Sequence, residues 1–278
     1  MKNNKFLKTL LPLLVLLLLL VAQRYLASSE EAEKSTPSQT ETPAPQPVRD
    51  AGQPAAAPHG TDILIEHEGF SLLFDVETLC PRWVAWELTA EETKGKVSRE
   101  GIEFIEDEKV PKEYRVTSYD YNGGHYGRGH MCPAGDMKWS KQAMQDCHYM
   151  TNICPQTAEL NKEWWEHLER ACRRWARQEG SIQIVCGPVF PPNPKRFGKK
   201  HRMAVPEGFY KVVLSLRAGS EKALGFYYSN DDSPQPMEDA VRSVDEIERL
   251  TGIDFFSILP DEQEDRLEAM TDLKAWGN

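Results

Sequence analysis

The fold of this protein is decided by three neighbouring stretches of its 278-residue sequence. They read Tyr126-Gly-Arg-Gly-His130, Asn152-Ile-Cys-Pro-Gln156 and Leu160-Asn-Lys-Glu-Trp-Trp-Glu-His-Leu-Glu169. The third stretch opens a predicted helix, because its large apolar residues and those that follow, up to Trp175, recur at helical spacing. Together the three stretches offer the imidazole of His130, the guanidinium group of Arg128, the carboxamides of Asn152 and Asn161 and the carboxylate of Glu169 within a short length of chain.

These side chains match the needs of phosphodiester hydrolysis. That reaction needs a base to activate water, positive charge on the phosphorane oxygens and assistance for the departing oxygen. His130 is a candidate base, because an imidazole with an ordinary pKa near 6.5 is mostly neutral yet accepts a proton at neutral pH. Asn161 is a candidate ligand for Mg²⁺, which is commonly held by one or two protein oxygens and retains several waters.

Each of these residues also has an ordinary structural explanation. Asn161 is a favourable helix N-cap, and Asn152 suits a turn before Pro155. Glu169 on a helix fits a solvated charge, and Arg128 between two glycines fits a surface loop. Only the joint order and spacing of the residues favours a functional site over these separate explanations.

That joint pattern resembles the DNA/RNA non-specific endonucleases. The signature of this family is Asp-Arg-Gly-His, then Asn-Ile-x-Pro-Gln, then Asn followed by Trp and Leu-Glu. The resemblance covers roughly residues 63–265, because other segments are also similar to the family: Trp83-Val-Ala-Trp86, Gly95-Lys-Val-Ser-Arg99, Cys186-Gly-Pro-Val189, Tyr210-Lys-Val and Val244-Asp-Glu-Ile-Glu248.

The resemblance implies an α+β protein with the ββα-metal nuclease fold, in which helices flank a central mixed or antiparallel sheet. It implies an endonuclease that cleaves DNA and RNA without strong sequence preference, with Mg²⁺ as cofactor and Mn²⁺ as a substitute. His130, at a strand end, would be the general base, and Asn161, on the next helix, would bind the metal directly. Related enzymes are often dimers, so a homodimer is a further expectation.

The resemblance also implies roles for four other residues. Arg128 and Arg99 would contact phosphate, for which the planar fork of arginine is well suited. Asn152 would orient the site around His130, and Glu169 would hold metal-bound waters.

Two features depart from the family pattern. Gly127 stands where the family has its leading aspartate, which puts the positioning role of that carboxylate in doubt. Cys132 and Cys154 stand where the family usually has small or aliphatic residues. A disulfide between them and a pair of packed thiols are equally open interpretations.

Charge alone does not recommend a nucleic-acid partner. The formal net charge is -10, and residues 61–278 carry 27 lysines and arginines against 38 aspartates and glutamates. Tight binding to nucleic acid usually needs a basic surface. The segment 195–202 is a local exception, and we expect Lys199, Lys200 and Arg202 to bind substrate beside the groove; a solvated loop is the alternative.

The N-terminal part of the chain differs from the rest in composition. Residues 1–27, with early lysines and an unbroken apolar run from Leu10 to Ala22, are typical of a signal peptide, or of a signal anchor that would place the protein on a membrane. Residues 28–60, rich in Pro, Ala, Ser and Thr, predict a disordered linker. Residues 61–278 would form the nuclease domain of an exported bacterial protein, whether periplasmic, membrane-anchored or extracellular.

The cysteines leave several interpretations open. All six lie after residue 61, and an even count behind an export signal favours disulfides, although buried free thiols are an alternative. A second interpretation is a zinc site, although the spacing of its candidate ligands fits no compact zinc pattern. These candidates are His125, His130, Cys132, Cys147, His148 and Cys154. A third alternative is a nuclease-like envelope protein that has lost activity and acts as a binding module.

A coarse pass along the remaining sequence predicts mixed α and β structure. Ser243-Val-Asp-Glu246 is a capping box for a helix that ends at Gly252. The β-favouring runs are residues 63–65, 71–74, 83–88, 148–153, 182–186, 210–216 and 223–228.

Overall fold

The computed structural model describes residue 54 and residues 61–277. The predicted signal segment, residues 1–27, and the predicted linker, apart from residue 54, lie outside the described residues. Among the residues described, no helix combines the length and the apolar character that a membrane crossing requires.

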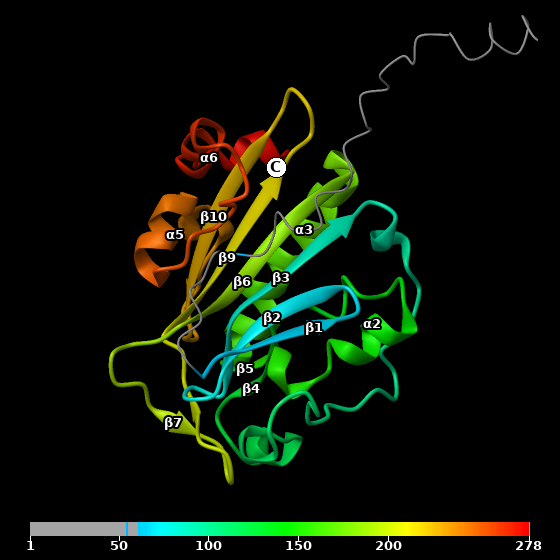
Figure 1. Ribbon diagram of the computed structural model, residues 1–278, viewed down its shortest axis with the longest axis vertical. Helices are drawn as coiled ribbons and strands as arrows, with labels where there is room; N and C mark the ends of the chain where they lie inside the picture. The colour runs from blue at the N-terminus through cyan, green and yellow to red at the C-terminus, as the bar shows by residue number, and fades with distance from the viewer. Residues whose placement is uncertain (1–53, 55–60, 278) are drawn as a thin grey trace, which may run out of the picture. The chain divides into compact units, whose positions relative to one another are not determined.

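An antiparallel sheet of seven strands runs through the described part of the chain, in the order β1-β2-β3-β6-β9-β10-β11 (Figure 1). All neighbouring strands in it are antiparallel. The strands are β1 (Ile63–His67), β2 (Phe70–Asp75), β3 (Cys80–Thr89), β6 (Ser181–Val189), β9 (Gly208–Ser215), β10 (Lys222–Ser229) and β11 (Val241–Arg242).

The sheet separates two hydrophobic cores. Successive side chains of a strand point to opposite faces, and β3 feeds both cores in this way. Val84 and Trp86 belong to one core, together with the apolar side of α3 (Trp165–Glu179), whereas Trp83 and Ala85 belong to the other. The sheet is therefore covered on both faces, which explains its nearly continuous apolar central strands.

Helices cover both faces of the sheet. The helix α3 buries Trp165, Leu168, Cys172 and Trp175 and ends before Gly180, which has a φ of +92°. On the other face lie α5 (Val244–Thr251) and α6 (Asp261–Glu268), seen beside β9 and β10 in Figure 1. The predicted capping box at the start of α5 is formed, and Gly252 ends this helix.

A smaller ββα unit lies on the α3 side of the sheet. The strand β4 (Gly127–His130) pairs with β5 (Ile153–Gln156), and the π-helical turn η5 (Leu160–Trp164) leads from there into α3. The short strands β7 (Arg196–Phe197) and β8 (Met203–Ala204) form a separate pair. The remaining helical pieces are η1 (Glu92–Lys94), η2 (Lys112–Tyr114), η3 (Ser118–Tyr121), α2 (Lys141–Asp146), η4 (Met150–Asn152), α4 (Met237–Ala240) and η6 (Leu273–Trp276).

The predicted α+β class, with a sheet flanked by helices, is confirmed. Six of the seven β-favouring runs lie in strands for most of their length, but the strand predicted at residues 148–153 is wrong. There the chain makes the 3-10 turn η4, in which Asn152 N–H bonds back to Tyr149 O, and β5 starts only at Ile153. The β-favouring side chains of this segment are buried by packing of the turn rather than by a strand.

The disulfide prediction is also wrong. All six cysteines are free and buried. Three of their thiols instead donate to backbone carbonyl oxygens: Cys80 to Ala204, Cys147 to Met144 and Cys186 to Met131. The cysteines therefore act as small core residues.

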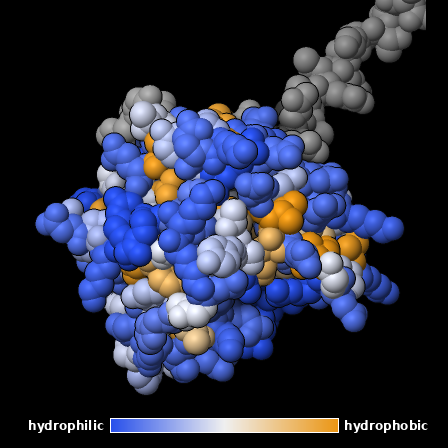
Figure 2. Space-filling model, turned by 90° about the horizontal axis from the view of Figure 1, so that it is seen from below, coloured by the Kyte–Doolittle hydropathy of each residue, from blue (hydrophilic) through white to orange (hydrophobic). Residues whose placement is uncertain are grey.

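The face of the molecule seen in Figure 2 is largely hydrophilic, and its hydrophobic residues form small separate patches. Such scattered apolar residues are normal on a folded surface and carry no functional argument.

Candidate active site

The ββα unit places two of the candidate site residues, His130 and Asn161, on neighbouring elements. In the β4–β5 pair His130 lies opposite Ile153 and Gly127 lies opposite Gln156. Gly129 permits this pairing, because a Cβ at that position would lie only 2.2 Å from Gln156 Oε1. Gly129 is thus required by the close approach of the Gln156 side chain.

A cavity of about 570 Å³ opens beside this unit. Its lining includes five of the predicted site residues, which come from the segment after η1, from β4, from η5 and from α3. These are Arg99, Arg128, His130, Asn161 and Glu169. Other lining residues are Phe104, Lys138, Met144, Lys162, Glu166 and Arg173.

His130 sits at the end of β4 with its ring between two aromatic neighbours. The ring centroids of Phe104 and His148 lie 5.2 and 5.0 Å away, and Trp165 Nε1–H donates to His130 O over 3.3 Å. Burial, followed by the charges of His148, Arg99 and Arg128, lowers the pKa of His130 to about 3. The imidazole is therefore neutral at physiological pH, and its surroundings make it a weaker base than a free histidine.

Arg128 precedes His130 by two residues and is held from two sides. Its Nη1 donates to Ser118 Oγ over 2.8 Å, and its guanidinium carbon lies 4.9 Å from the centroid of Phe104. Arg99 reaches the same cavity from an exposed segment. With Arg173, three guanidinium groups therefore border the cavity that contains the neutral imidazole.

Asn161 lies within η5 rather than at the N-cap of a helix, which excludes the N-cap explanation. Its Nδ2 donates to Arg128 O over 3.4 Å, and no hydrogen bond to its Oδ1 is formed by the described residues. The carboxamide oxygen is thus free to bind a cation. π-helical turns such as η5 are frequent at functional sites.

Glu169 follows Asn161 by about two helical turns and is partly buried in the same cavity. Burial raises its pKa to about 7, against the opposing effects of Lys211 and Arg173. It is not the solvated surface charge that its helical position alone suggested.

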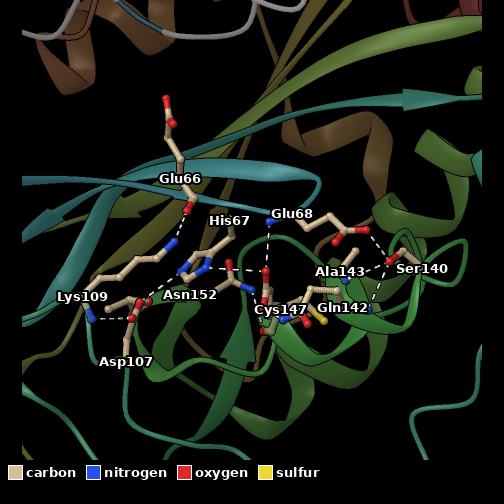
Figure 3. A network of polar contacts seen from close by, with 12 residues as sticks. Glu66, His67, Glu68, Asp107, Lys109, Ser140, Gln142, Ala143, Cys147 and Asn152 are labelled. Carbon is tan, nitrogen blue, oxygen red and sulfur yellow. Dashed lines mark hydrogen bonds and ion pairs between the residues drawn. The ribbon is translucent and has the colours of Figure 1, made fainter.

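Asn152 is the one predicted catalytic residue that does not line the cavity. It is fully buried and bonds to the backbone of two cysteines, one of which, Cys147, is labelled beside it in Figure 3. Its Oδ1 accepts from Cys132 N at 2.9 Å, and its Nδ2 donates to Cys132 O and Cys147 O, both at 2.8 Å. Asn152 thus closes the turn η4, as the structural alternative expected, and its side chain also braces the end of β4 against the end of α2.

The basic cluster also lies outside the cavity. Lys199, Lys200 and Arg202 belong to the loop between β7 and β8, where Lys199 Nζ lies 5.0 Å from the ring centroid of Tyr119. Arg202 donates to the carbonyl oxygens of Gly198 and Arg196. None of the three residues lines the cavity, and their contact with substrate beside the groove stays a prediction.

The structure locates the departure from the family pattern at Gly127 and the residues of the zinc alternative. A Cβ on Gly127 would lie 3.6 Å from Asn161 Nδ2, so the missing family aspartate would face Asn161. Of the six residues of the zinc alternative, only His130, Cys147 and His148 gather, with ligand atoms within 4.8 Å of one another.

Sequence reasoning missed a buried ionic group next to Glu169. Lys211 on β9 is fully buried, and its Nζ lies 4.4 Å from the ring centroid of Trp165. Asp136 accepts from Arg173 Nη1 at 2.8 Å and from the indole of Trp86 at 3.1 Å. The signal in the sequence was a single lysine inside an otherwise apolar strand.

Known proteins resemble this chain over most of the described part. It is 32% identical to human mitochondrial endonuclease G over 208 residues, which are 70% of each chain. It is 30% identical over 217 residues to the mitochondrial nuclease 1 of Schizosaccharomyces pombe, covering 72% of this chain and 67% of the relative. A crystal structure of an EndoG/EndoGI complex contains a chain that matches with a TM-score of 0.69 and 26% identity, covering 73% of this chain and 89% of that one.

These relatives contradict the expected location. Proteins from human, fission yeast and budding yeast that match this chain are named mitochondrial nucleases, which points away from an exported bacterial protein. The prediction of export was based on residues 1–27, which share only hydrophobicity and basic charge with secretory signals.

The family description "DNA/RNA non-specific endonuclease" matches residues 50–262. The chain has the ββα-metal nuclease fold of its structural neighbour and is an enzyme, a metal-dependent nuclease that acts on nucleic acid. By its sequence, its fold and the residues around its cavity, it belongs to the DNA/RNA non-specific endonuclease family.

Proposed function

We propose that the domain predicted at residues 61–278 hydrolyses phosphodiester bonds of DNA and RNA with His130 as general base and Asn161 as the direct ligand of Mg²⁺. The observation that carries this proposal is the shared cavity, where a neutral imidazole, the guanidinium groups of Arg99 and Arg128 and a free carboxamide oxygen meet. Each group matches one requirement of the reaction.

His130 would take the proton of the attacking water. Because burial keeps the pKa of its ring at about 3, nearly every molecule carries the neutral base at neutral pH. The ring is held in place by Phe104 and His148 and by the indole bond to its own carbonyl. A fixed and neutral base needs little rearrangement before proton transfer.

The residues around Asn161 fit a hydrated Mg²⁺. The Nδ2 bond to Arg128 O leaves Oδ1 as the free donor, and Glu169 and Glu166 offer carboxylates that accept hydrogen bonds from waters. All are hard oxygen groups, which Mg²⁺ prefers, and Mn²⁺ accepts the same set. When bound, such an ion stabilises negative charge on the phosphate and on the departing oxygen.

Arg128 and Arg99 would bind the phosphate. The anchoring of Arg128 by Ser118 and Phe104 preserves its orientation, so little side-chain freedom is lost when phosphate binds. Asn152 would act through the backbone, by holding Cys132 and hence the end of β4 in place.

Lys199, Lys200 and Arg202 would meet nucleic acid that extends beyond the cavity. The ring centroids of Phe197 in β7 and Tyr126, the residue before β4, lie 5.3 Å apart. The loop between β7 and β8 therefore flanks the strand that carries His130. With a net acidic domain, such a local basic loop would supply phosphate contacts, and its removal should flatten the salt dependence of KM.

Cleavage of supercoiled plasmid and of single-stranded RNA in Mg²⁺, with and without EDTA, tests the proposal. His130→Ala should lower kcat by about 10² to 10⁴ while the circular-dichroism spectrum stays unchanged. Asn161→Ala should lose activity similarly and need more Mg²⁺. His125→Ala is the matched control, because His125 is exposed and does not line the cavity. Near-normal cleavage by His130→Ala would contradict the assignment.

One observation favours a second candidate, zinc bound by His130, Cys147 and His148. His148 Nδ1 lies 2.8 Å from Met144 O and its buried Nε2 has no partner, the arrangement of a histidine prepared to bind metal. Metal analysis of protein purified without chelator separates the candidates. Stoichiometric zinc favours this cluster, and activity restored by Mg²⁺ in zinc-free protein favours the first proposal.

A further inference from the structure

The helices α5 and α6 present acidic side chains to one another on the face of the sheet opposite α3. Asp245 and Glu248 are three residues apart on α5, and Glu264 and Glu268 are four residues apart on α6. Residues at these spacings lie on the same side of a helix. Two like-charged pairs therefore meet above the core that contains Ile247 and Leu267.

The carboxylates come close enough to share one ion. Ligand oxygens of Asp245, Glu248 and Glu268 all lie within 4.8 Å of one another. No ion pair formed by the described residues includes any of these three or Glu264. The mutual repulsion of the group is thus not offset by a lysine, arginine or histidine.

Glu268 makes this arrangement costly. The residue is only 5% exposed, yet its Oε1 is buried without any hydrogen-bond partner, as is Oε1 of Glu264. Buried carboxylates are normally hydrogen-bonded, paired or bound to a metal. Burial, followed by the charges of Glu248, Glu264 and Asp245, raises the pKa of Glu268 to about 8. Without a cation this carboxyl group is held in an unfavourable place.

We propose that a Ca²⁺ ion binds Asp245, Glu248 and Glu268 and thereby links α5 to α6. The ligand set contains only carboxylates, which Ca²⁺ accepts in one- or two-oxygen modes within an irregular shell of about six to eight oxygens. Mg²⁺ demands near-octahedral geometry and retains its waters, and zinc favours the imidazole and thiol groups that this cluster lacks. Glu248 has one oxygen to spare, because its Oε1 accepts from Phe255 N at 2.7 Å.

This site is separate from the catalytic cavity and does not depend on the proposed function. The α5 and α6 helices cover the second core, whereas His130 and Asn161 lie on the α3 side of the sheet. A ligand that binds the folded chain alone stabilises it in proportion to the logarithm of its concentration. Ca²⁺ should therefore raise the melting temperature whether or not the protein cleaves nucleic acid.

The test is thermal unfolding of the full chain, freed of metal by chelation, with millimolar Ca²⁺ or Mg²⁺. The wild type should gain several degrees in Tm with Ca²⁺ and less with Mg²⁺. Glu268→Gln should lose the Ca²⁺ response and, without ions, melt no lower than wild type, because a neutral amide replaces a carboxyl group whose ionised form is disfavoured by burial. Glu262→Gln, an exposed carboxylate on the same helix, should keep the response.

Two further measurements keep the outcome decisive. Asn161→Ala should keep the Ca²⁺ response, which excludes binding at the catalytic cavity as its source. Calorimetric titration of Ca²⁺ into metal-free wild type should show one site that is absent from Glu268→Gln, or from Asp245→Asn if the first variant does not fold. The proposal is overturned by no Ca²⁺ binding in wild type, by an equal response in Glu268→Gln, or by a stronger response to Mg²⁺ than to Ca²⁺ in Asn161→Ala.

Discussion

Replacing Asn152 by alanine should destabilise the protein more than any other single change to the predicted catalytic residues. The side chain is fully buried and forms three hydrogen bonds, one from Cys132 N and one each to Cys132 O and Cys147 O. Alanine would leave all three backbone groups buried without these partners. The end of β4 would also lose its link to the residue that follows α2.

The expected loss follows from these three groups. Leaving a buried polar group unsatisfied costs about 1–3 kcal/mol, so partial relaxation around the site gives a total of roughly 3–6 kcal/mol. A typical domain has a free energy of unfolding of only about 5–15 kcal/mol. The variant should therefore melt roughly 6–24 °C below wild type, at about 2–4 °C per kcal/mol.

Urea unfolding followed by tryptophan fluorescence measures this loss. Asn122→Ala is a suitable control, since Asn122 is exposed, and should change the unfolding free energy by less than about 0.5 kcal/mol. Asn152→Asp keeps the acceptor for Cys132 N but turns an oxygen toward two carbonyls, so it should not rescue stability. A loss below about 1 kcal/mol in Asn152→Ala would refute the bracing role.

Three further predictions concern the same region. Gly129→Ala should lower the free energy of unfolding in urea by about 1–3 kcal/mol, because its Cβ would overlap Gln156. Gly127→Ala, whose Cβ has normal contacts, should be nearly neutral. Equal effects of the two substitutions would show that the β4–β5 spacing is not limiting. The pKa of His130 is about 3 in the folded protein against an ordinary 6.5, so only the unfolded chain binds a proton there as the pH falls below 6.5. The free energy of unfolding of wild type should therefore fall, by up to about 1.4 kcal/mol per pH unit more than that of His130→Ala. Parallel stability curves for the two proteins would contradict the buried neutral imidazole. Thiol labelling without reductant should modify none of the six cysteines in the native protein and all of them in denaturant; fewer labelled thiols after denaturation would reveal a disulfide.

The sequence determined those features that depend on local spacing. The stripe of Trp165, Leu168, Cys172 and Trp175 specified the buried side of α3, and the Ser243 capping box specified the start of α5. Most β-favouring runs became strands for the same reason. The order and spacing of the motif residues, through their resemblance to the family pattern, was also sufficient to predict a shared site for His130 and Asn161.

Local pattern was insufficient where packing decides. Residues 148–153 have β-favouring side chains, yet the bond from Met150 N to Ile105 O, far away in the chain, holds them in a turn. Pairing of the cysteines could not be judged either, since an even count says nothing about distance. The cysteines are instead buried as free thiols, and those of Cys147 and Cys186 donate to backbone carbonyl oxygens.

Only the tertiary structure decided what surrounds the site and what lies on its opposite side. Lys211 from β9 and Asp136 from the segment after β4 meet next to Glu169 of α3, although these residues are widely separated in sequence. The acidic side chains of α5 and α6 likewise face each other only because both helices pack on the same core. Periodicity within a segment reports which side of that segment is buried, whereas the partner it meets depends on how distant segments share the limited buried surface.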